Sequence, residues 1–204
     1  MSEIQNHYES EADEGLRLTA GPGLLELART QEILRRHLPG GVLRVLDVGG
    51  GAGIHASWLA DDGHTVVLVD PVPRHVSQVR SLGIAASLGD ARSLGFPDAS
   101  FDAVLVLGPL YHLVSRSDRV QALREARRVV RPGGWVFVAA ISRFASLIDG
   151  VHRGFLFEPS FRSIVARDLA EGQHRNPTHR PHWFTAAYFH HPSELPLEAA
   201  TIQQ

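Results

Sequence analysis

The stretch VLDVGGGAG at residues 45–53 decides the fold of this chain. An apolar run, interrupted only by Asp47, leads directly into a glycine-rich turn, and the segment IHASWLA at residues 54–60 then places its apolar residues at helical spacing. This pattern predicts a strand, a tight loop and a helix. Glycines let a backbone approach a ligand closely, and the first N–H groups of a helix can bind polar ligand groups. We therefore expect a ligand-binding loop at the end of a strand.

Three kinds of nucleotide-binding loop have to be compared with this stretch. A Walker loop requires a Lys after its last glycine, and the chain contains no Lys. A dinucleotide fingerprint that began at Gly49 would require a glycine where the chain has Ile54. A structural glycine turn in another α/β protein remains an alternative. The pattern that fits is an acid followed by alternating glycines, here Asp47, Gly49, Gly51 and Gly53, with Gly50 as an extra glycine.

The composition excludes several other kinds of chemistry. The chain has 204 residues, which suffices for one domain with a substantial core. Its net charge of −2 gives no electrostatic reason to expect a nucleic-acid partner. Without Cys or Lys, it has no disulfide, thiolate metal site, Cys nucleophile or Schiff-base Lys. It shows neither the apolar region of a signal peptide nor the roughly 18 apolar residues of a membrane span, so we expect a cytoplasmic protein without a membrane partner.

A second acidic residue stands at the end of the next strand. The apolar run at residues 66–69 ends at Asp70, about 20 residues beyond the glycine turn, where an α/β nucleotide fold places the acceptor for its ribose hydroxyls. A carboxylate can accept hydrogen bonds from both hydroxyls. Asp70 is therefore a candidate ligand-binding residue, with Pro71 beside it.

The remaining pattern predicts the fold class. Strand-like and helix-like segments alternate five times, which indicates an α/β fold with a doubly wound, mainly parallel sheet and helices on both faces. The expected strand order is 3-2-1-4-5. The strands are expected at residues 45–48, 66–69, 84–88, 103–108 and 135–141.

Several motifs together resemble a known family. The glycine stretch resembles motif I of the class I S-adenosylmethionine-dependent methyltransferases. Two further segments resemble other parts of the same family, SLGFPDASFD at residues 93–102 and LREARRVVRPGGWVFVA at residues 123–139. The segments DPVPRHV and LGPLYHL are similar to a bacterial, actinomycete-like branch that acts on small molecules. The resemblance covers residues 1–142 well and about 180–195 loosely. It implies a Rossmann-like fold, S-adenosylmethionine as cofactor with S-adenosylhomocysteine as product, and methyl transfer to an O, N or C nucleophile of a small molecule.

The resemblance also implies roles for particular residues. In that family the glycine loop lies against the methionine part of the cofactor, the strand-end acid binds the ribose, and an Asp-Ala pair after the third strand meets the adenine. Asp90 could instead be an ordinary turn former, and Arg17, which could meet the cofactor carboxylate, could be a solvated side chain. The residues that match cofactor-binding positions are Asp47, Gly49, Gly50, Gly51, Gly53, Asp70, Pro71, Asp90, Ala91, Leu107 and Arg17.

Two residues after the fourth strand are candidates for catalysis. His112 titrates in the range that suits a general base, and Tyr111 could orient the acceptor or pack against the sulfonium, because aromatic faces attract cations. His112 could also cap the following helix and face away from the pocket.

The C-terminal third is harder to interpret. We expect one domain over residues 1–204, with a cap and first helix at 1–40, a cofactor-binding core at 42–142 and a lid and substrate-side segment at 143–204. The apolar residues between Phe144 and Ile164 form either a lid or the core of a connecting helix. The scattered histidines lack zinc-site spacing, so no metal is expected. Strands 6 and 7 of the family are uncertain here, and their absence would expose an edge of the sheet to a second subunit.

Two other function classes remain open. A non-catalytic or inactive S-adenosylmethionine-binding protein would share the cofactor site. An NAD(P)-dependent oxidoreductase is disfavoured by the glycine spacing.

Overall fold

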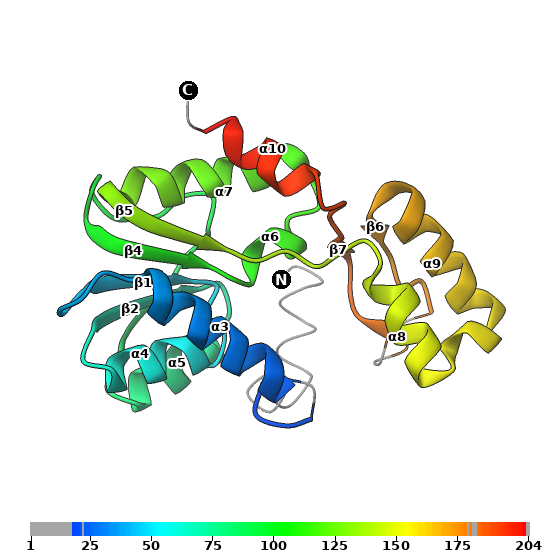
Figure 1. Ribbon diagram of the computed structural model, residues 1–204, viewed down its shortest axis with the longest axis horizontal. Coiled ribbons are helices and arrows are strands. Elements are labelled where there is room, and N and C mark those ends of the chain that lie inside the picture. The colour runs from blue at the N-terminus through cyan, green and yellow to red at the C-terminus, as the bar shows by residue number, and fades with distance from the viewer. Residues whose placement is uncertain (1–17, 22, 179, 181–182, 203–204) are drawn as a thin grey trace.

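A parallel sheet of five strands forms the centre of the molecule (Figure 1). The computed structural model describes residues 18–21, 23–178, 180 and 183–202. The strand order is β3-β2-β1-β4-β5, and all four neighbouring pairs are parallel, as the sequence predicts. The strands are β1 (Arg44–Val48), β2 (Thr65–Asp70), β3 (Ala85–Leu88), β4 (Phe101–Val106) and β5 (Val130–Val138).

Helices cover both faces of this sheet, which buries its apolar strands on both sides. One core cluster joins the sheet to α3, α4 and α5, and a second joins it to α7 with contributions from α6 and α10. The central strands β1 and β4 are therefore mainly apolar and buried, because helices cover both of their faces. The helices are α3 (Gly23–His37), α4 (Ile54–Asp61), α5 (Pro73–Ser81), α6 (Pro109–His112), α7 (Arg116–Val129) and α10 (Glu194–Ala200).

The last two strands of the sheet differ from their predicted bounds. The fourth strand was expected at 103–108 and the fifth at 135–141, but both begin earlier. The pairing runs from Phe101 opposite Val130 to Ala103 opposite Trp135, so residues 131–134 bulge out of β5. A Cβ added at Gly134 would lie 2.6 Å from the carbonyl oxygen of Asp102, so a larger residue would push this bulge off β4. The glycines that suggested a break before the strand therefore lie inside it.

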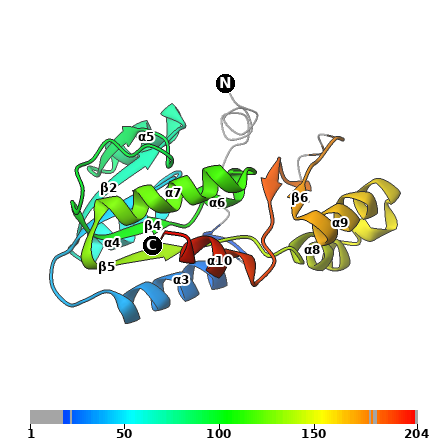
Figure 2. The same ribbon diagram turned by 90° about the horizontal axis from the view of Figure 1, so that it is seen from above.

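A smaller C-terminal unit lies beside the sheet and has its own core (Figure 2). Phe161, Ile164 and Trp183 are buried there, whereas Phe144 and Phe157 are exposed by 42% and 88%. Of the apolar positions between residues 144 and 164, Phe161 and Ile164 thus belong to a core, whereas Phe144 and Phe157 do not. The elements of the unit are α8 (Ala145–Arg153), η1 (Phe155–Phe157), α9 (Pro159–Glu171), β6 (Gln173–His174) and β7 (Ala187–Tyr188).

Strands β6 and β7 do not extend the main sheet. They pair antiparallel with each other, and only an isolated bridge between Ser142 and His190 links this region to the segment after β5. In the described part of the chain, β5 is therefore an edge strand, and Trp135 on it is 43% exposed. The homodimer expected from such an edge stays a prediction. Within the same described residues, no helix is long and apolar enough to cross a membrane.

A buried ion pair fixes the C-terminal helix α10 against α7. Arg119 and Glu198 are 2% and 3% exposed, and the shortest distance between their charged atoms is 2.7 Å. Arg119 also donates to the carbonyl oxygens of Leu113 and Val114, directly after α6. This arrangement holds the end of α6 in place, and α6 forms part of the site described below.

Candidate functional site

A cavity of about 420 Å³ opens at the carboxyl ends of β1, β2 and β4. This is the edge of an open α/β sheet at which ligands bind, and the volume is typical of a small-molecule site. The cavity brings together most of the residues that the sequence singles out. They are Asp47, Gly49, Gly50, Gly51, Asp70, Pro71, Asp90, Ala91, Leu107, Tyr111 and His112. Gly53 is not part of its lining, and Arg17 lies outside the described residues.

The glycine loop has the conformation that its sequence requires. Gly49 has a φ of +65°, and a Cβ added there would lie 2.5 Å from Cγ of Pro109. Gly53 has a φ of +84°, and a Cβ there would lie 2.6 Å from Cγ2 of Val79. Side chains at either position would combine an unfavourable backbone with a clash. Gly53 thus allows α4 to begin against α5, while Gly49 allows the loop to approach Pro109 at the start of α6.

Asp47 lies beneath the loop in an environment that disfavours its charge. It is 1% exposed, and burial, together with the charge of Asp70, raises its pKa to about 7. Its Oδ2 atom has no hydrogen-bond partner among the described residues. A buried carboxyl of this kind is sensitive to any positive charge that enters the cavity.

Asp70 is held in place by three groups that surround its carboxylate. Its Oδ2 accepts the N–H of Gly51 at 3.0 Å, and its Oδ1 accepts the N–H of Val72 at 2.9 Å. Nδ1 of His75 lies 3.0 Å from the same Oδ1. A carboxylate oxygen can accept more than one hydrogen bond, so Asp70 can still accept from a ligand hydroxyl.

His75 is a site residue that the sequence reasoning missed. It is 3% exposed and lines the cavity from the first turn of α5. The sequence indicated this role only weakly: His75 follows the strand-end residue Asp70 by five positions, in the helix that comes after this strand. A histidine in a short helix does not by itself indicate which way the ring points, and for this reason the signal was not used.

Asp90 stabilises a turn, which is the alternative role that the sequence allowed for it. Its carboxylate accepts the N–H of Arg92 at 2.8 Å and the Nε–H of Arg92 at 2.9 Å. Hydrogen bonds from the Arg92 side chain lower the pKa of Asp90, and a second ion pair joins Arg92 to Asp118. Asp90 and Ala91 also line the cavity, so the turn presents them to a ligand.

Tyr111 and His112 both line the cavity. The two ring centroids are 4.6 Å apart. A Cβ added at Gly108 would lie 3.6 Å from the hydroxyl of Tyr111 and 3.0 Å from the carbonyl oxygen of Gly49. The Tyr111 hydroxyl therefore lies beside the glycine loop. On their other side, both rings meet Phe184, with centroid separations of 6.3 Å and 5.9 Å.

The charges around the cavity favour a cationic ligand over a diphosphate. Arg92 is the one arginine among the described lining residues, and it is engaged by Asp90. A diphosphate would meet a surplus of negative charge here, whereas a sulfonium with an ammonium group would find opposite charges. The carboxylates that line the cavity, as far as the structure describes it, are Glu26, Asp47, Asp70 and Asp90.

The histidines of the C-terminal region take part in local hydrogen bonds. His174 meets the carboxylate of Asp168 and the carbonyl oxygen of Trp183, and His190 meets Glu198. His179 and His182 lie outside the described residues. Among the residues that the structure covers, no group of three or more His, Cys, Asp or Glu side chains is placed to hold a metal ion.

Comparisons with known proteins agree with this geometry. Residues 46–138 match the family model described as a methyltransferase domain. An uncharacterized methyltransferase of Mycobacterium tuberculosis is 40% identical over 99 residues, which are 48% of this chain and 39% of that protein. A demethylmenaquinone methyltransferase of Beutenbergia cavernae is 42% identical over 101 residues, which are 48% of this chain and 41% of that protein.

A solved structure shows the same fold over a longer stretch. A SAM-dependent methyltransferase from Methanosarcina mazei superimposes with a TM-score of 0.67 at 18% identity, over 83% of this chain and 82% of that one. Residues 46–138 are thus similar to methyltransferases in sequence, and the chain has the fold of a solved SAM-dependent methyltransferase. This similarity implies S-adenosylmethionine as the cofactor. Each match to the two curated relatives spans less than half of the relative's length.

Proposed function

We propose that the chain binds S-adenosylmethionine in the 420 Å³ cavity and transfers its methyl group to an O, N or C nucleophile of a small molecule, with S-adenosylhomocysteine as the product. The observation that supports this most strongly is the position of Asp70, which the loop N–H of Gly51 holds at the sheet edge inside an acidic cavity. That arrangement suits a ribose and a sulfonium and is unfavourable for a diphosphate.

The lining residues divide into three groups along the proposed ligand. The loop glycines and Asp47 would meet the methionine part, Asp70 and Pro71 the ribose, and Asp90 with Ala91 the adenine. Leu107 lies beside the loop at the end of β4, where it would border the reacting end. Residues 143–204 would form the acceptor side of the site, with residues 1–40 as its cap.

The sulfonium of the bound cofactor supplies an electrophilic methyl group. The chain's own contribution is to align the acceptor and to exclude water. His112 is the proposed acceptor for the proton of an acceptor hydroxyl or ammonium, and the ring of Tyr111 is the proposed contact for the sulfonium. For a carbon acceptor that is already an anion, the base is not required.

A small molecule fits this site better than a nucleic acid. The net charge of the chain is −2, and the described cavity lining carries more carboxylates than arginines. Phosphate backbones bind to surfaces rich in Lys and Arg. The Beutenbergia cavernae relative is a demethylmenaquinone methyltransferase by name, which supports a small-molecule acceptor.

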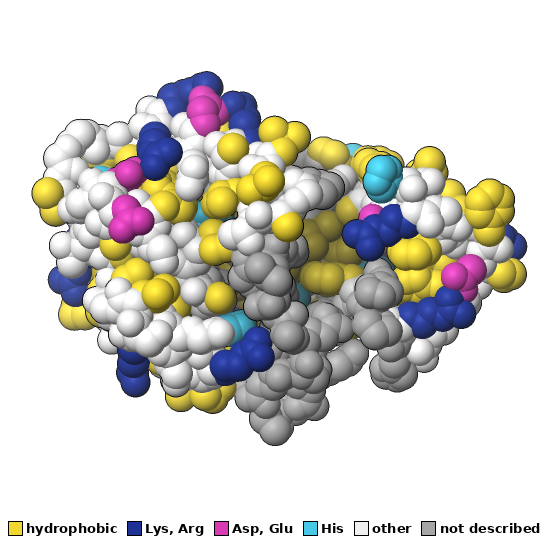
Figure 3. All heavy atoms as spheres, turned by 90° about the horizontal axis from the view of Figure 1, so that it is seen from below, with side chains coloured by type: hydrophobic (Ala, Val, Ile, Leu, Met, Phe, Trp, Pro, Cys, Tyr) yellow, Lys and Arg dark blue, Asp and Glu magenta, His cyan; other side chains and the backbone are white. Residues whose placement is uncertain are grey.

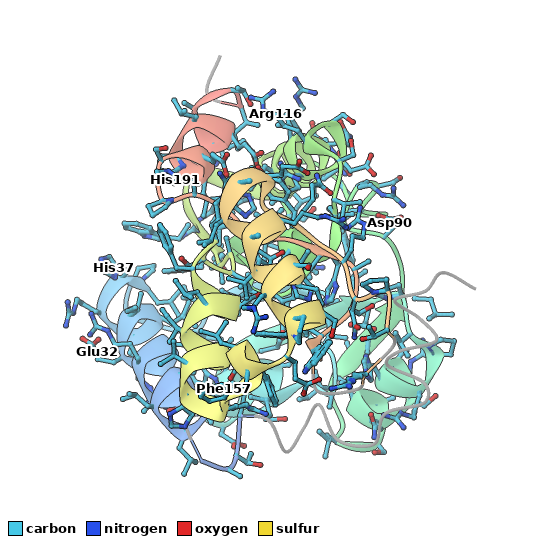
Figure 4. The ribbon with its side chains drawn as sticks, turned by 90° about the vertical axis from the view of Figure 1, so that its right-hand side faces the viewer. Glu32, His37, Asp90, Arg116, Phe157 and His191 are labelled. Carbon is cyan, nitrogen blue, oxygen red and sulfur yellow. The ribbon has the colours of Figure 1, made fainter. Side chains whose placement is uncertain are left out.

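The proposal is tested by a methyl-transfer assay with a panel of phenols, quinols and amines, in which S-adenosylhomocysteine is measured by mass spectrometry. We expect product with at least one class of acceptor. We expect His112→Gln to lower kcat about 10²- to 10⁴-fold with a hydroxyl or amine acceptor while cofactor affinity is kept. His37→Gln is the matched control, because His37 is exposed at the end of α3, on the side of the molecule away from Asp90 (Figure 4). Equal rates for His112→Gln and wild type would remove His112 as the base.

A further inference from the structure

A second cavity, of about 190 Å³, lies in the C-terminal unit, beside the segment that connects this unit to the main sheet after β5. Hydrophobic side chains line the hollow where these two parts meet (Figure 3). The cavity walls are mainly aromatic and aliphatic, formed by Phe161, Trp183, Phe184, Phe189, Ile141 and Ala145. None of the predicted cofactor-binding residues lines this cavity, so it requires an explanation of its own.

Phe184 lines the second cavity and lies beside His112, which lines the first. Its ring lines the second cavity, where its centroid is 6.1 Å from that of His174. The centroid of the same ring is 5.9 Å from that of His112, which lines the first cavity. The backbone also passes from one cavity to the other within two residues after β5, since Ala139 lines the first and Ile141 the second. A molecule at His112 therefore needs to extend only past one ring to enter the second cavity.

The backbone at this wall is held in an uncommon conformation. Phe184 has a φ of +62°, in the left-handed region that a bulky side chain rarely adopts. Nδ2 of Asn176 donates to the carbonyl oxygen of Phe184 at 3.0 Å and to that of Arg180 at 2.8 Å, which closes the segment into a loop. Conformations of this kind are unfavourable and persist where the surroundings determine them, often at ligand sites.

The polar groups at the second cavity are already engaged. Both ring nitrogens of His174 have partners, Oδ2 of Asp168 and the carbonyl oxygen of Trp183, each at 2.8 Å. Ser146 donates its hydroxyl to the same Asp168 oxygen. Because Asp149 is the carboxylate that lines this cavity, an anionic ligand group would lose its water without gaining a counter-charge. A water molecule would lack the two to four polar partners that an internal water requires.

The size and the walls of the cavity together define the ligand. A cavity of about 150 Å³ lined by apolar side chains is sufficient to bind benzene, and this one is about 190 Å³. Aromatic walls favour a planar ring, which packs edge-to-face or offset against them. The ring of Phe161 already lies 5.1 Å from that of Trp183, centroid to centroid.

We propose that this cavity binds an uncharged aromatic ring of the methyl acceptor, while the nucleophile of the acceptor lies beyond Phe184 at His112. This inference rests on the proposed methyl transfer and specifies its acceptor class. The acceptor is then an aromatic compound that carries its nucleophile on a substituent long enough to pass the Phe184 ring.

The test uses 4-fluorophenol as an uncharged ring and 4-fluorobenzoate as its charged counterpart, each followed by ¹⁹F NMR line broadening on the full chain. We expect 4-fluorophenol to bind at least tenfold more tightly than 4-fluorobenzoate. Ala145→Leu fills the cavity from the start of α8 and should weaken 4-fluorophenol binding at least tenfold. Ala166→Leu, on the exposed face of α9, is the matched control and should bind the ring as wild type does.

Calorimetry with S-adenosylhomocysteine on the same samples separates this inference from the proposed function. If Ala145→Leu loses cofactor affinity as well, the smaller Ala145→Val replaces it. Binding of S-adenosylhomocysteine without binding of 4-fluorophenol, or ring binding that Ala145→Leu leaves unchanged, would overturn the aromatic subsite and leave the methyltransferase assignment intact. Ring binding that Ala145→Leu abolishes, in a chain that does not bind S-adenosylhomocysteine, would confirm the aromatic cavity and overturn the proposed methyl transfer.

Discussion

His75 holds the carboxylate of Asp70 in place, with Nδ1 3.0 Å from Oδ1, and both residues are at most 4% exposed. Because a carboxylate only accepts hydrogen bonds, Nδ1 must carry the proton in this pair. The contact leaves Oδ2 with the N–H of Gly51 as its protein donor, at the cavity edge. His75 is therefore a positioning residue for the proposed ribose contact, and it acts through Asp70.

Two substitutions at His75 separate its hydrogen bond from its bulk. His75→Leu removes the donor, and we expect it to weaken S-adenosylhomocysteine about tenfold, the effect of one hydrogen bond to a charged group. His75→Asn keeps a donor near the position of Nδ1 and should recover most of the affinity. Calorimetry with S-adenosylhomocysteine and with its 2′-deoxyribose analogue tests whether His75 acts through the contact between Asp70 and the ribose. If it does, His75→Leu should lower the affinity for the deoxy ligand by a smaller factor. Equal losses for the two His75 variants would argue for packing alone.

Asp47 makes the stability of the protein depend on pH near neutrality. Burial, reinforced by Asp70, raises its pKa from 3.8 to about 7. A carboxyl with a raised pKa favours the folded state while it is protonated, so this contribution is complete below about pH 4 and is lost as the pH rises to 7. Within that window, the free energy of unfolding should fall by about 1.4 kcal/mol for each pH unit of increase. Urea unfolding between pH 4 and 8 should show this slope in wild type and in Asp61→Asn, an exposed control on α4, and should show it strongly reduced in Asp47→Asn.

The ion pair between Arg119 and Glu198 should be essential for stability. Glu198→Gln leaves the guanidinium of Arg119 buried without a counter-charge, which should cost about 3–5 kcal/mol in the free energy of unfolding. Glu171→Gln, at an exposed position near the end of α9, should change it by less than about 0.5 kcal/mol. Denaturant titration at pH 7 measures both, and similar midpoints for the two variants would show that the pair is not needed to hold α10.

The same pair predicts loss of stability in acid. Burial raises the pKa of Glu198, but the hydrogen bonds from His190 and Arg119 outweigh this effect and lower the pKa from 4.5 to about 2. A carboxyl with a lowered pKa stabilises the folded state above its ordinary pKa, and this stabilisation is lost as the pH falls from about 4.5 to 2. Thermal melts across this range should show a decline in Tm for wild type that is reduced in Glu198→Gln.

The core of the fold follows from local sequence, and the C-terminal unit does not. The glycine loop and Asp70 are recognisable because a strand, a turn and an acid follow each other at short spacing, and parallel pairing then brings the strand ends together. His75 was missed because the direction of a ring on a helix depends on its packing. The pair of Arg119 and Glu198 joins residues 79 positions apart, and no local pattern indicates such a contact.

The aromatic cavity was unpredictable for a related reason. Phe184 reaches His112 through a loop whose shape is fixed by hydrogen bonds from Asn176, and neither the loop nor its positive φ has a sequence signature without a glycine. The start of β5 was predicted too late for a different reason. The glycines in the bulge at residues 131–134 suggested a break, but the strand continues through them.

The most direct test of the central claim is calorimetric titration of the wild-type chain with S-adenosylhomocysteine and, in parallel, with NADH, followed by the same pair of titrations on Asp70→Ala. The structure predicts saturable binding of S-adenosylhomocysteine alone, weakened at least tenfold by the substitution. Binding of NADH, or no binding of S-adenosylhomocysteine by a folded wild-type chain, would contradict the assignment of this cavity.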